Sequence, residues 1–367
     1  MRIRLIFLFL FIANMAIAQQ KLRPGFDAVE YAQLLAVTGY RDKTADSAKL
    51  NTLKKDFRLA YRSPEVGMKN RWTLYVNGQE KTAVIFIRGT VENDTSWLAN
   101  YYFAMIPAQG TLQIARGKTF HYKLAANKHA AVHAGWTVSL GFMAEDIEQK
   151  IIAQHAGGIS DFYIFGHSQG GAIAYLLRSY LHYRQQDGTL PKDIFFKTYC
   201  SAAPKPGNIN YAYDYDFINR GPWAFNVVNA VDWVPETPYT VQAMRDMYPL
   251  NPLVQMRRDL KDEKLFKRIV GRYLIGKVEK RPRKAQQMFT DYFGHKIYKY
   301  AVSKALPGFK EPQYAPTVNY MRAGTPVILM PDEAYFQLFD EAKNPKDKFL
   351  HHSYEAYYYL LKKDYLK

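Results

Sequence analysis

The sequence is poor in cysteine, poor in acidic residues and free of long apolar runs after its first residues. Cys200 is the only cysteine, which excludes an internal disulfide framework and leaves stability to packing. Its neighbours Phe195, Phe196 and Tyr199 predict a buried strand and an inert core thiol rather than a catalytic one. No internal repeat or low-complexity tract is present. A chain of 367 residues with 48% hydrophobic and 15% aromatic content can form one large α/β domain or two ordinary ones.

The shortage of acidic residues leaves a strong positive charge. The chain has 50 Lys and Arg against 33 Asp and Glu, a formal net charge of +17. Such an excess favours anionic partners such as lipid surfaces, acidic polymers or nucleic acid. No nucleic-acid recognition motif accompanies the charge, so nucleic acid is not expected as a partner. A basic surface that serves only solubility is the alternative interpretation.

The first residues have the pattern of an export signal. Arg2 and Arg4 precede the apolar run Leu5–Ile12, and small residues up to Ala18 form a cleavage site. We therefore expect residues 1–18 to be a signal peptide and the mature protein to be secreted or periplasmic. The apolar run is too short for a spanning helix, although a retained N-terminal anchor is the alternative. No cysteine lies at the cleavage site, which argues against a lipid-anchored lipoprotein.

The rest of the chain alternates between strand and helix patterns. Helical patterning dominates residues 23–62. The predicted strands are 72–77, 82–87, 162–165, 194–200, 225–229 and 326–330, and the predicted helices are 133–154 and 172–184. This alternation predicts an α/β fold with a mostly parallel central sheet and helices on both faces. Residues 19–367 are interpreted as a single domain, with a basic helical insertion over about 240–316.

A serine between two glycines marks the candidate nucleophile. Gly166-His167-Ser168-Gln169-Gly170 fits the G-x-S-x-G pattern, with an apolar strand before it and a helix after it. A tight strand-to-helix turn needs small neighbours because its backbone is strained and crowded. The N–H groups at the start of the helix can stabilise negative charge beside Ser168. An ordinary tight turn is the alternative.

A serine nucleophile requires a base and an acid that orients the base. Asp232 follows an apolar strand at the sheet edge where strand ends converge, whereas Asp214, Asp216 and Glu236 lack that position. Three histidines follow it, namely His295, His351 and His352. His295 lies in the basic insertion and is interpreted as structural. The residue pattern alone leaves His351 and His352 as alternatives.

An oxyanion hole needs two donors near the nucleophile. The backbone N–H of Gln169 is the first candidate, because it follows the serine. Thr90 is the second, through its N–H and its hydroxyl, since Arg88-Gly89-Thr90 ends a predicted buried strand. A plain strand-ending turn is the alternative interpretation of these three residues.

Together these segments resemble the class 3 lipases, a family that includes fungal triacylglycerol lipases and plant acyl hydrolases. The segments that carry the resemblance occur in the family's order and are Val84–Thr90, Val132–Trp136, Phe165–Gly171, Tyr199–Asn208, Asn229–Pro238 and His352–Tyr357. The departures are Ile87, Phe165, Gln169, Cys200 and Ala203. The resemblance covers residues 72–232 and resumes near Tyr320, so it leaves out the N-terminal helices and the basic insertion.

The resemblance implies an α/β-hydrolase fold and ester hydrolysis through an acyl-enzyme. It implies Ser168 as nucleophile, His352 as base, Asp232 as acid, and Thr90 with Gln169 as the oxyanion hole, with no metal or organic cofactor. His133 resembles a structural residue of the family. The expected substrate is an acylglycerol or another lipid ester. A phospholipase A-type acyl hydrolase on anionic lipid surfaces and a non-catalytic binding protein on the same fold are the alternatives.

Two further segments predict contact with lipid. Residues 91–108 carry an apolar face that includes Trp97, and the resemblance implies a helical lid there, with a permanently packed core cluster as the alternative. The basic insertion has Lys and Arg at roughly helical spacing, interleaved with apolar residues such as Phe266 and Ile269. Such a helix can dock on an anionic membrane surface, and a solvated charged face over an ordinary core stripe is the alternative.

Overall fold

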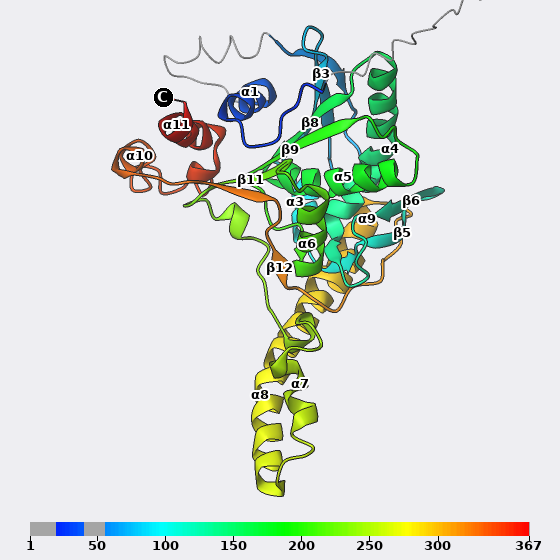
Figure 1. Cartoon of the computed structure of the whole chain (residues 1–367), viewed down its shortest axis with the longest axis vertical. Helices are drawn as coiled ribbons and strands as arrows, with labels where there is room; N and C mark the ends of the chain where they lie inside the picture. The colour runs from blue at the N-terminus through cyan, green and yellow to red at the C-terminus, as the bar shows by residue number, and fades with distance from the viewer. Residues whose placement is uncertain (1–19, 40–55, 367) are drawn as a thin grey trace, which may run out of the picture.

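The computed structural model describes residues 20–39 and 56–366. The predicted signal peptide, residues 1–18, lies outside this part of the chain. A seven-stranded sheet forms the centre, in the order β1-β2-β3-β8-β9-β11-β13 (Figure 1). Its strands are β1 (Arg58–Arg62), β2 (Trp72–Asn77), β3 (Thr82–Ile87), β8 (Asp161–His167), β9 (Phe195–Ser201), β11 (Ala224–Asn229) and β13 (Thr325–Leu329). From β3 to β13 the neighbouring strands are parallel, and β1 and β2 are antiparallel additions at one edge.

Helices cover both faces of this sheet, as the alternation of patterns predicts (Figure 1). One face carries α4 (Ala134–Ala156), α5 (Gln169–Gln186) and α6 (Ile209–Ile218), and the other carries α1 (Ala28–Thr38), α10 (Glu333–Leu338) and α11 (Tyr354–Tyr365). Strand β3 lies between the two layers of helices, so both of its faces are covered and its residues are apolar in a continuous run. Its residues alternate between two core clusters, Ile85 on the α5 side and Val84 on the α1 side, and all six are buried. The fold is that of an α/β-hydrolase.

Smaller elements extend the α5 side of the sheet. A short helix, α3 (Asp94–Tyr101), follows β3. A four-stranded sheet contains β4 (Met105–Pro107), β7 (Ala131–His133), β10 (Gly207–Asn208) and β12 (Tyr320–Met321), and a hairpin joins β5 (Gln109–Ala115) to β6 (Lys118–Lys123). The prediction of helical patterning over 23–62 is confirmed for α1 and is wrong for Arg58–Arg62. That segment forms the edge strand β1, because pairing with β2 overrides the local pattern.

The predicted basic insertion is helical and projects from the body (Figure 1). It contains α7 (Pro252–Asp259), α8 (Leu265–Thr290), two π-helical turns (Asp291–Lys296 and Tyr298–Val302) and α9 (Ser303–Ala305). In the described residues, no helix is long and apolar enough to cross a membrane.

The register of the parallel strands brings their carboxyl ends to one edge of the sheet. Ile87 pairs with Gly166, His167 with Ser201, and Ser201 with Val227. The loops that follow β3, β8 and β11 therefore leave the sheet next to each other. These are the loops that hold Thr90, Ser168 and Asp232.

Candidate active site

Ser168 occupies the turn between β8 and α5, as the G-x-S-x-G pattern predicts. Its backbone has φ 61° and ψ −132°, a conformation that is rare for a residue with a side chain. Both flanking glycines are required by contact. A Cβ on Gly166 would lie 2.1 Å from the carbonyl oxygen of Gly170, and one on Gly170 would lie 2.1 Å from that of Ile87. The close packing of strand and helix therefore holds the serine in its strained turn at the sheet edge.

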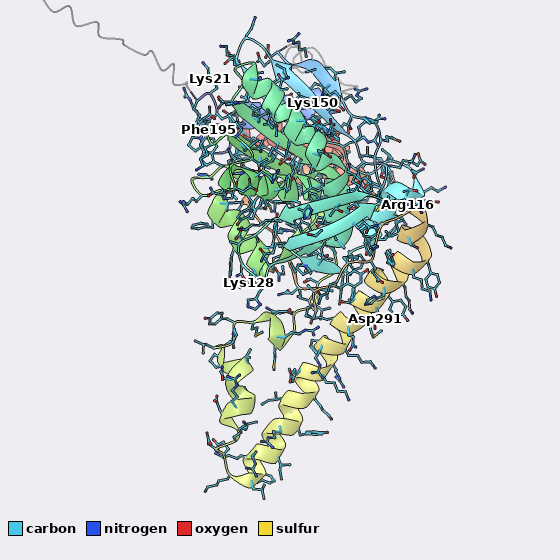
Figure 2. All side chains as sticks on the ribbon, turned by 90° about the vertical axis from the view of Figure 1, so that its right-hand side faces the viewer. Lys21, Arg116, Lys128, Lys150, Phe195 and Asp291 are labelled. Carbon is cyan, nitrogen blue, oxygen red and sulfur yellow. The ribbon has the colours of Figure 1, made fainter. Side chains whose placement is uncertain are left out.

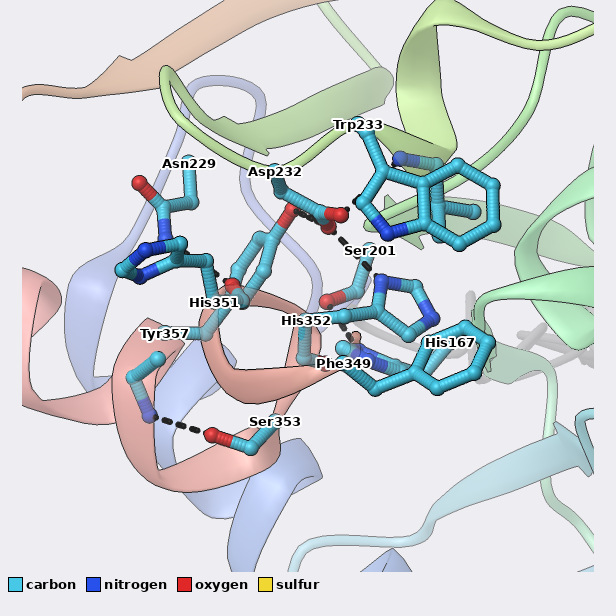
Figure 3. A network of polar contacts seen from close by, with 12 residues as sticks. His167, Ser201, Asn229, Asp232, Trp233, Phe349, His351, His352, Ser353 and Tyr357 are labelled. Atoms are coloured by element: carbon cyan, nitrogen blue, oxygen red, sulfur yellow. Dashed lines mark hydrogen bonds and ion pairs between the residues drawn. The ribbon is translucent and has the colours of Figure 1, made fainter. Parts of the chain in front are cut away.

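Asp232 and His352 form a buried pair near this turn (Figure 3). The His352 Nδ1 atom lies 2.7 Å from Asp232 Oδ2, and the Asp232 side chain is fully buried. Two more groups hold the carboxylate: the Tyr357 hydroxyl donates to Oδ2 at 2.8 Å, and the backbone N–H of Val234 donates to Oδ1 at 3.0 Å. With these three partners the buried carboxylate is satisfied, and it fixes the Nδ1–H tautomer of the imidazole.

The opposite ring nitrogen of His352 has no such partner. Its Nε2 atom is buried and makes no hydrogen bond within the part of the chain that the structure describes. His352 and Ser168 line the same cavity, which has a volume of about 1100 Å³. A neutral imidazole whose Nδ1–H is committed to a carboxylate has a free acceptor at Nε2. The geometry thus leaves an unpartnered ring nitrogen on a histidine that lines the same cavity as the serine.

The two adjacent histidines have different surroundings. The His351 ring lies between the Tyr335 hydroxyl, 2.8 Å from Nδ1, and Glu341, 2.9 Å from Nε2, so both of its nitrogens are occupied away from Asp232. His295 pairs with Glu311 at 2.8 Å and is exposed on the insertion. Of the three histidines considered from the sequence, His352 alone contacts Asp232.

His167, inside the pentapeptide, links the elbow to the loop of His352 (Figure 3). Its Nε2–H donates to the backbone carbonyl of His352 at 2.8 Å, and its Nδ1 accepts from the Ser201 hydroxyl at 2.9 Å. The Tyr31 hydroxyl lies 2.5 Å from the same serine oxygen. Burial lowers the pKa of His167 well below its usual value, and the neighbouring His352 adds to the effect. The neutral ring therefore serves as a fixed brace beneath the candidate base.

Both candidate oxyanion donors line the same cavity as Ser168. Gln169 is the first residue of α5, so its N–H has no partner within the helix, and Thr90 follows the end of β3. Asn100 Nδ2 donates to the Thr90 Oγ1 atom at 3.0 Å. Because that bond occupies a lone pair of the hydroxyl, the hydroxyl proton remains available to donate into the cavity.

The side chain of Gln169 is buried and belongs to an amide network. Its Nε2 donates to Asn100 Oδ1 at 2.8 Å and to the Ser96 carbonyl at 3.1 Å, and its Oε1 accepts from Asn70 Nδ2 at 3.4 Å. Trp136 Nε1 also donates to Asn100 Oδ1, at 3.1 Å. Gln169, one of the departures from the pattern of the class 3 lipases, therefore ties helix α3 to the elbow and orients the Asn100 amide beside Thr90.

The segment predicted as a lid divides into two parts. Residues 102–108 belong to the core: Tyr102, Met105 and Ile106 are fully buried, and β4 pairs with β7. Helix α3 instead lies at the cavity, where Trp97 stacks on Tyr101. The other Phe, Trp and Tyr residues of the cavity wall are Tyr75, Phe86, Phe103, Trp136, Trp233, Tyr239, Phe349 and Tyr354. The alternative of a packed core cluster thus holds for the second part, and a lid hypothesis is confined to α3.

Two residues that the sequence analysis set aside are buried. His133 caps α4 by accepting from the Trp136 N–H and stacks on the Trp136 ring at 3.5 Å, and burial lowers its pKa well below the usual value. Cys200 is fully buried in β9, and burial raises the pKa of its thiol, which favours the unreactive form.

Sequence reasoning missed several residues that support the site, namely Tyr31, Asn70, Asn100, Ser201 and Tyr357. Tyr357 had a usable signal, because it lies one helical turn and a half after His352 on the face that α11 turns toward the sheet. The others come from distant segments, and their contacts depend on the assembled fold.

Comparisons with known proteins identify a family model and similar proteins. The family model of lipase (class 3) matches residues 84–242. A secreted mono- and diacylglycerol lipase 1 of Fusarium solani is 29% identical over 188 residues, covering 50% of this chain and 48% of that protein. The chain thus spans about half the length of the curated relative it matches.

Solved fungal lipases are similar at lower identity. Rhizomucor miehei triacylglyceride lipase has 20% identity and a TM-score of 0.43, covering 59% of this chain and 77% of that one. A lipase from Rhizopus microsporus var. chinensis has 19% identity and a TM-score of 0.40, covering 59% and 71%. The segment that the lipase (class 3) model matches, residues 84–242, contains Thr90, Ser168 and Asp232.

Proposed function

We propose that this protein is a serine hydrolase of carboxylic esters and that acylglycerols are its main substrates. The observation that carries the proposal is the buried Asp232–His352 pair: its Nε2 atom has no hydrogen-bond partner among the described residues, and His352 lines the same cavity as the strained elbow serine, Ser168. A binding protein has no need of a strained serine, a committed tautomer and an unpartnered imidazole nitrogen in one cavity.

In the proposed mechanism, Ser168 Oγ attacks the ester carbonyl while His352 Nε2 accepts its proton. Asp232 stabilises the imidazolium that forms, with Tyr357 and the Val234 N–H holding the carboxylate in place. The proton then passes from Nε2 to the leaving alcohol, which leaves an acyl-enzyme. Water attacks that ester in the second half, again with His352 as the base.

The oxyanion of each tetrahedral intermediate is proposed to lie between α5 and the end of β3. The Gln169 N–H would donate from one side, and the Thr90 N–H and hydroxyl from the other. Asn100 supports this role, since its bond to Oγ1 leaves the Thr90 proton as the donor. The arrangement stabilises developing charge without reorganisation at the moment of reaction.

The substrate class follows from the walls of the cavity. A cavity of about 1100 Å³ with ten Phe, Trp and Tyr residues in its wall suits an acyl chain better than a small polar ester. The family match and the naming of the Fusarium relative as a mono- and diacylglycerol lipase support the same class. The relative is named as secreted, and together with the N-terminal pattern up to Ala18 this supports export of the protein.

The test is hydrolysis of p-nitrophenyl esters of increasing chain length, together with mono- and diacylglycerols and a diacyl phospholipid. Ser168→Ala and His352→Gln are expected to lower kcat by roughly 10⁴-fold or more. His351→Gln is the matched control, since its ring nitrogens contact Tyr335 and Glu341 and not Asp232, and it should stay within about threefold of the wild type.

Three outcomes would contradict the proposal. Undiminished turnover in Ser168→Ala would reject the nucleophile, and loss of activity in His351→Gln with retention in His352→Gln would reject the base. Hydrolysis of the phospholipid in preference to every acylglycerol would replace the proposed substrate class with a phospholipase A-type activity.

A further inference from the structure

The hairpin formed by α7 and α8, residues 252–290, has more apolar surface than its own packing uses. It leaves the body as a separate arm, and Figure 2 shows from a second side that its outer part lies beyond Asp291, away from the sheet. On α8 only Ile275 and Gln286 are buried. By contrast Phe266 is 78% exposed, Leu265 62% and Ile269 59%. A contiguous apolar patch of this kind on an otherwise polar surface marks an interaction site.

The exposed apolar residues of α8 lie on one arc of the helix. Their spacing of three and four residues follows the helical repeat, and the set is Leu265, Phe266, Ile269, Val270, Tyr273 and Leu274. Closer to the body the same arc continues with Lys277, Lys280, Arg281 and Lys284, all exposed. The arm therefore presents an apolar outer part followed by a basic collar.

The charge of the arm identifies its partner. Residues 252–290 contain twelve Lys and Arg and four Asp and Glu, an excess of eight positive charges in a chain whose formal net charge is +17. A second copy of the same arm is disfavoured, because two surfaces with this charge repel each other. An acidic polymer or a nucleic acid would match the charge and leave the apolar arc in water. An anionic bilayer matches both, with acyl chains for the arc and headgroups for the collar.

The end of the arm nearest the body, residues 286–293, packs against residues that line the active-site cavity. Phe289 stacks on Tyr239 with ring centroids 5.4 Å apart, and Phe293 stacks on Phe103 at 4.0 Å. Tyr239 and Phe103 both line the cavity of Ser168. The buried Gln286 side chain also donates to the Val241 carbonyl, which fixes α8 to the chain that leaves the cavity. An arm attached in this way holds the cavity close to whatever surface the arm binds.

We propose that the α7–α8 hairpin docks the protein on the surface of an anionic lipid bilayer, with the apolar arc of α8 in the interface and the basic collar on the headgroups. The arm lies on the membrane and does not span it. The inference rests on the proposed function, because it names the surface on which that hydrolysis takes place. Its test nevertheless measures binding, which does not require turnover.

The experiment measures co-sedimentation of the full chain carrying Ser168→Ala with vesicles of phosphatidylcholine alone or with 30 mol% phosphatidylglycerol. We expect at least tenfold tighter partitioning to the anionic vesicles at low salt, and loss of that preference in 0.5 M NaCl. The collar variant Lys277→Glu/Lys280→Glu/Lys284→Glu should lose at least 100-fold in partitioning. The arc variant Phe266→Ser/Ile269→Ser should lose at least tenfold while keeping its charge.

A matched charge reversal, Lys128→Glu/Lys192→Glu/Lys346→Glu, alters exposed lysines on the body and should partition within about threefold of its parent. Equal binding to neutral and anionic vesicles, or equal losses in the collar and body variants, would overturn the proposal. The proposal would also be overturned if light scattering found the parent protein as a dimer and the arc variant as a monomer. In that case a second copy of the chain would cover the arc.

The collar and arc changes are also made with Ser168 intact and assayed on a soluble short ester. Unchanged turnover there shows that the variants fold and that the binding losses belong to the arm. If no variant and no wild type hydrolyses any ester while anionic vesicles still bind, the proposed function fails and the docking surface stands.

Discussion

Replacing Thr90 by valine removes one hydroxyl from the cavity wall and keeps the shape of the side chain. In the structure Asn100 Nδ2 donates to Thr90 Oγ1 at 3.0 Å, and Asn100 is itself held by Gln169 and Trp136. The hydroxyl is thus oriented before substrate arrives. If its proton stabilises the oxyanion, valine removes a donor that acts in the transition state and leaves the ground-state cavity unchanged.

Loss of one oxyanion donor in serine hydrolases typically costs about 10²- to 10³-fold in kcat, or about 2.7–4 kcal/mol. We expect the lower end, about 10²-fold, because the N–H groups of Thr90 and Gln169 remain. KM for a soluble ester should change by less than about threefold, since the interaction strengthens only in the transition state. The unfolding free energy should fall by only about 1 kcal/mol, the contribution of the bond from Asn100.

The assay is steady-state hydrolysis of a short p-nitrophenyl ester, with Thr90→Ser as the control that restores the hydroxyl. The serine variant should stay within about fivefold of the wild type. A valine variant with kcat within threefold of the wild type would refute the assignment of the hydroxyl. A valine variant that loses activity only through a higher KM would show that Thr90 binds substrate without stabilising the transition state.

Two further predictions concern the groups around the base. Tyr357→Phe removes the hydroxyl that donates to Asp232 Oδ2, and we expect about tenfold lower kcat and about 1–2 kcal/mol lower unfolding free energy; unchanged kcat and unchanged urea midpoint would contradict the supporting role. Burial lowers the pKa of His133 and of His167, so the folded state keeps both rings neutral and their contribution to stability, complete above pH 6.5, is lost as the pH falls below it. Each of the two histidines should lower the unfolding free energy by up to about 2 kcal/mol as the pH falls from 7.5 to 5. The measurement is urea denaturation at both pH values, and equal or greater stability at pH 5 would contradict the prediction.

Much of the central sheet was predictable because its signals are local. Runs such as Ala83–Ile87 can be covered on both faces only inside a parallel sheet, and the glycines around Ser168 mark a turn that other residues would crowd. Asp232 was predictable for the same reason, since it directly follows a strand. The β5–β6 hairpin was missed, although its buried and exposed residues alternate with period two around the turn at Gly117.

The contacts that complete the site were not predictable, because each joins segments far apart in the chain. The brace from Tyr31 through Ser201 and His167 to the loop of His352 spans more than 300 residues. The sequence could distinguish His352 from His351 only through the resemblance to a family. The structure distinguishes them by their contacts, because only the His352 ring reaches Asp232. A local pattern records which residue types occur, whereas the direction of an imidazole ring is set by what packs against it.

The amide network at Gln169 also bears on how this site can change. Asn70, Asn100 and Gln169 share their hydrogen bonds, so a leucine at position 169 would remove the acceptor of the buried Asn70 Nδ2 group and leave Asn100 Oδ1 with Trp136 as its donor. An exchange that is neutral in an apolar setting is therefore unfavourable here, and Asn100 in turn fixes the hydroxyl of Thr90. The three positions are therefore energetically coupled. A directed-evolution library that varies one of them alone will contain mostly variants that lose hydrogen bonds of this network.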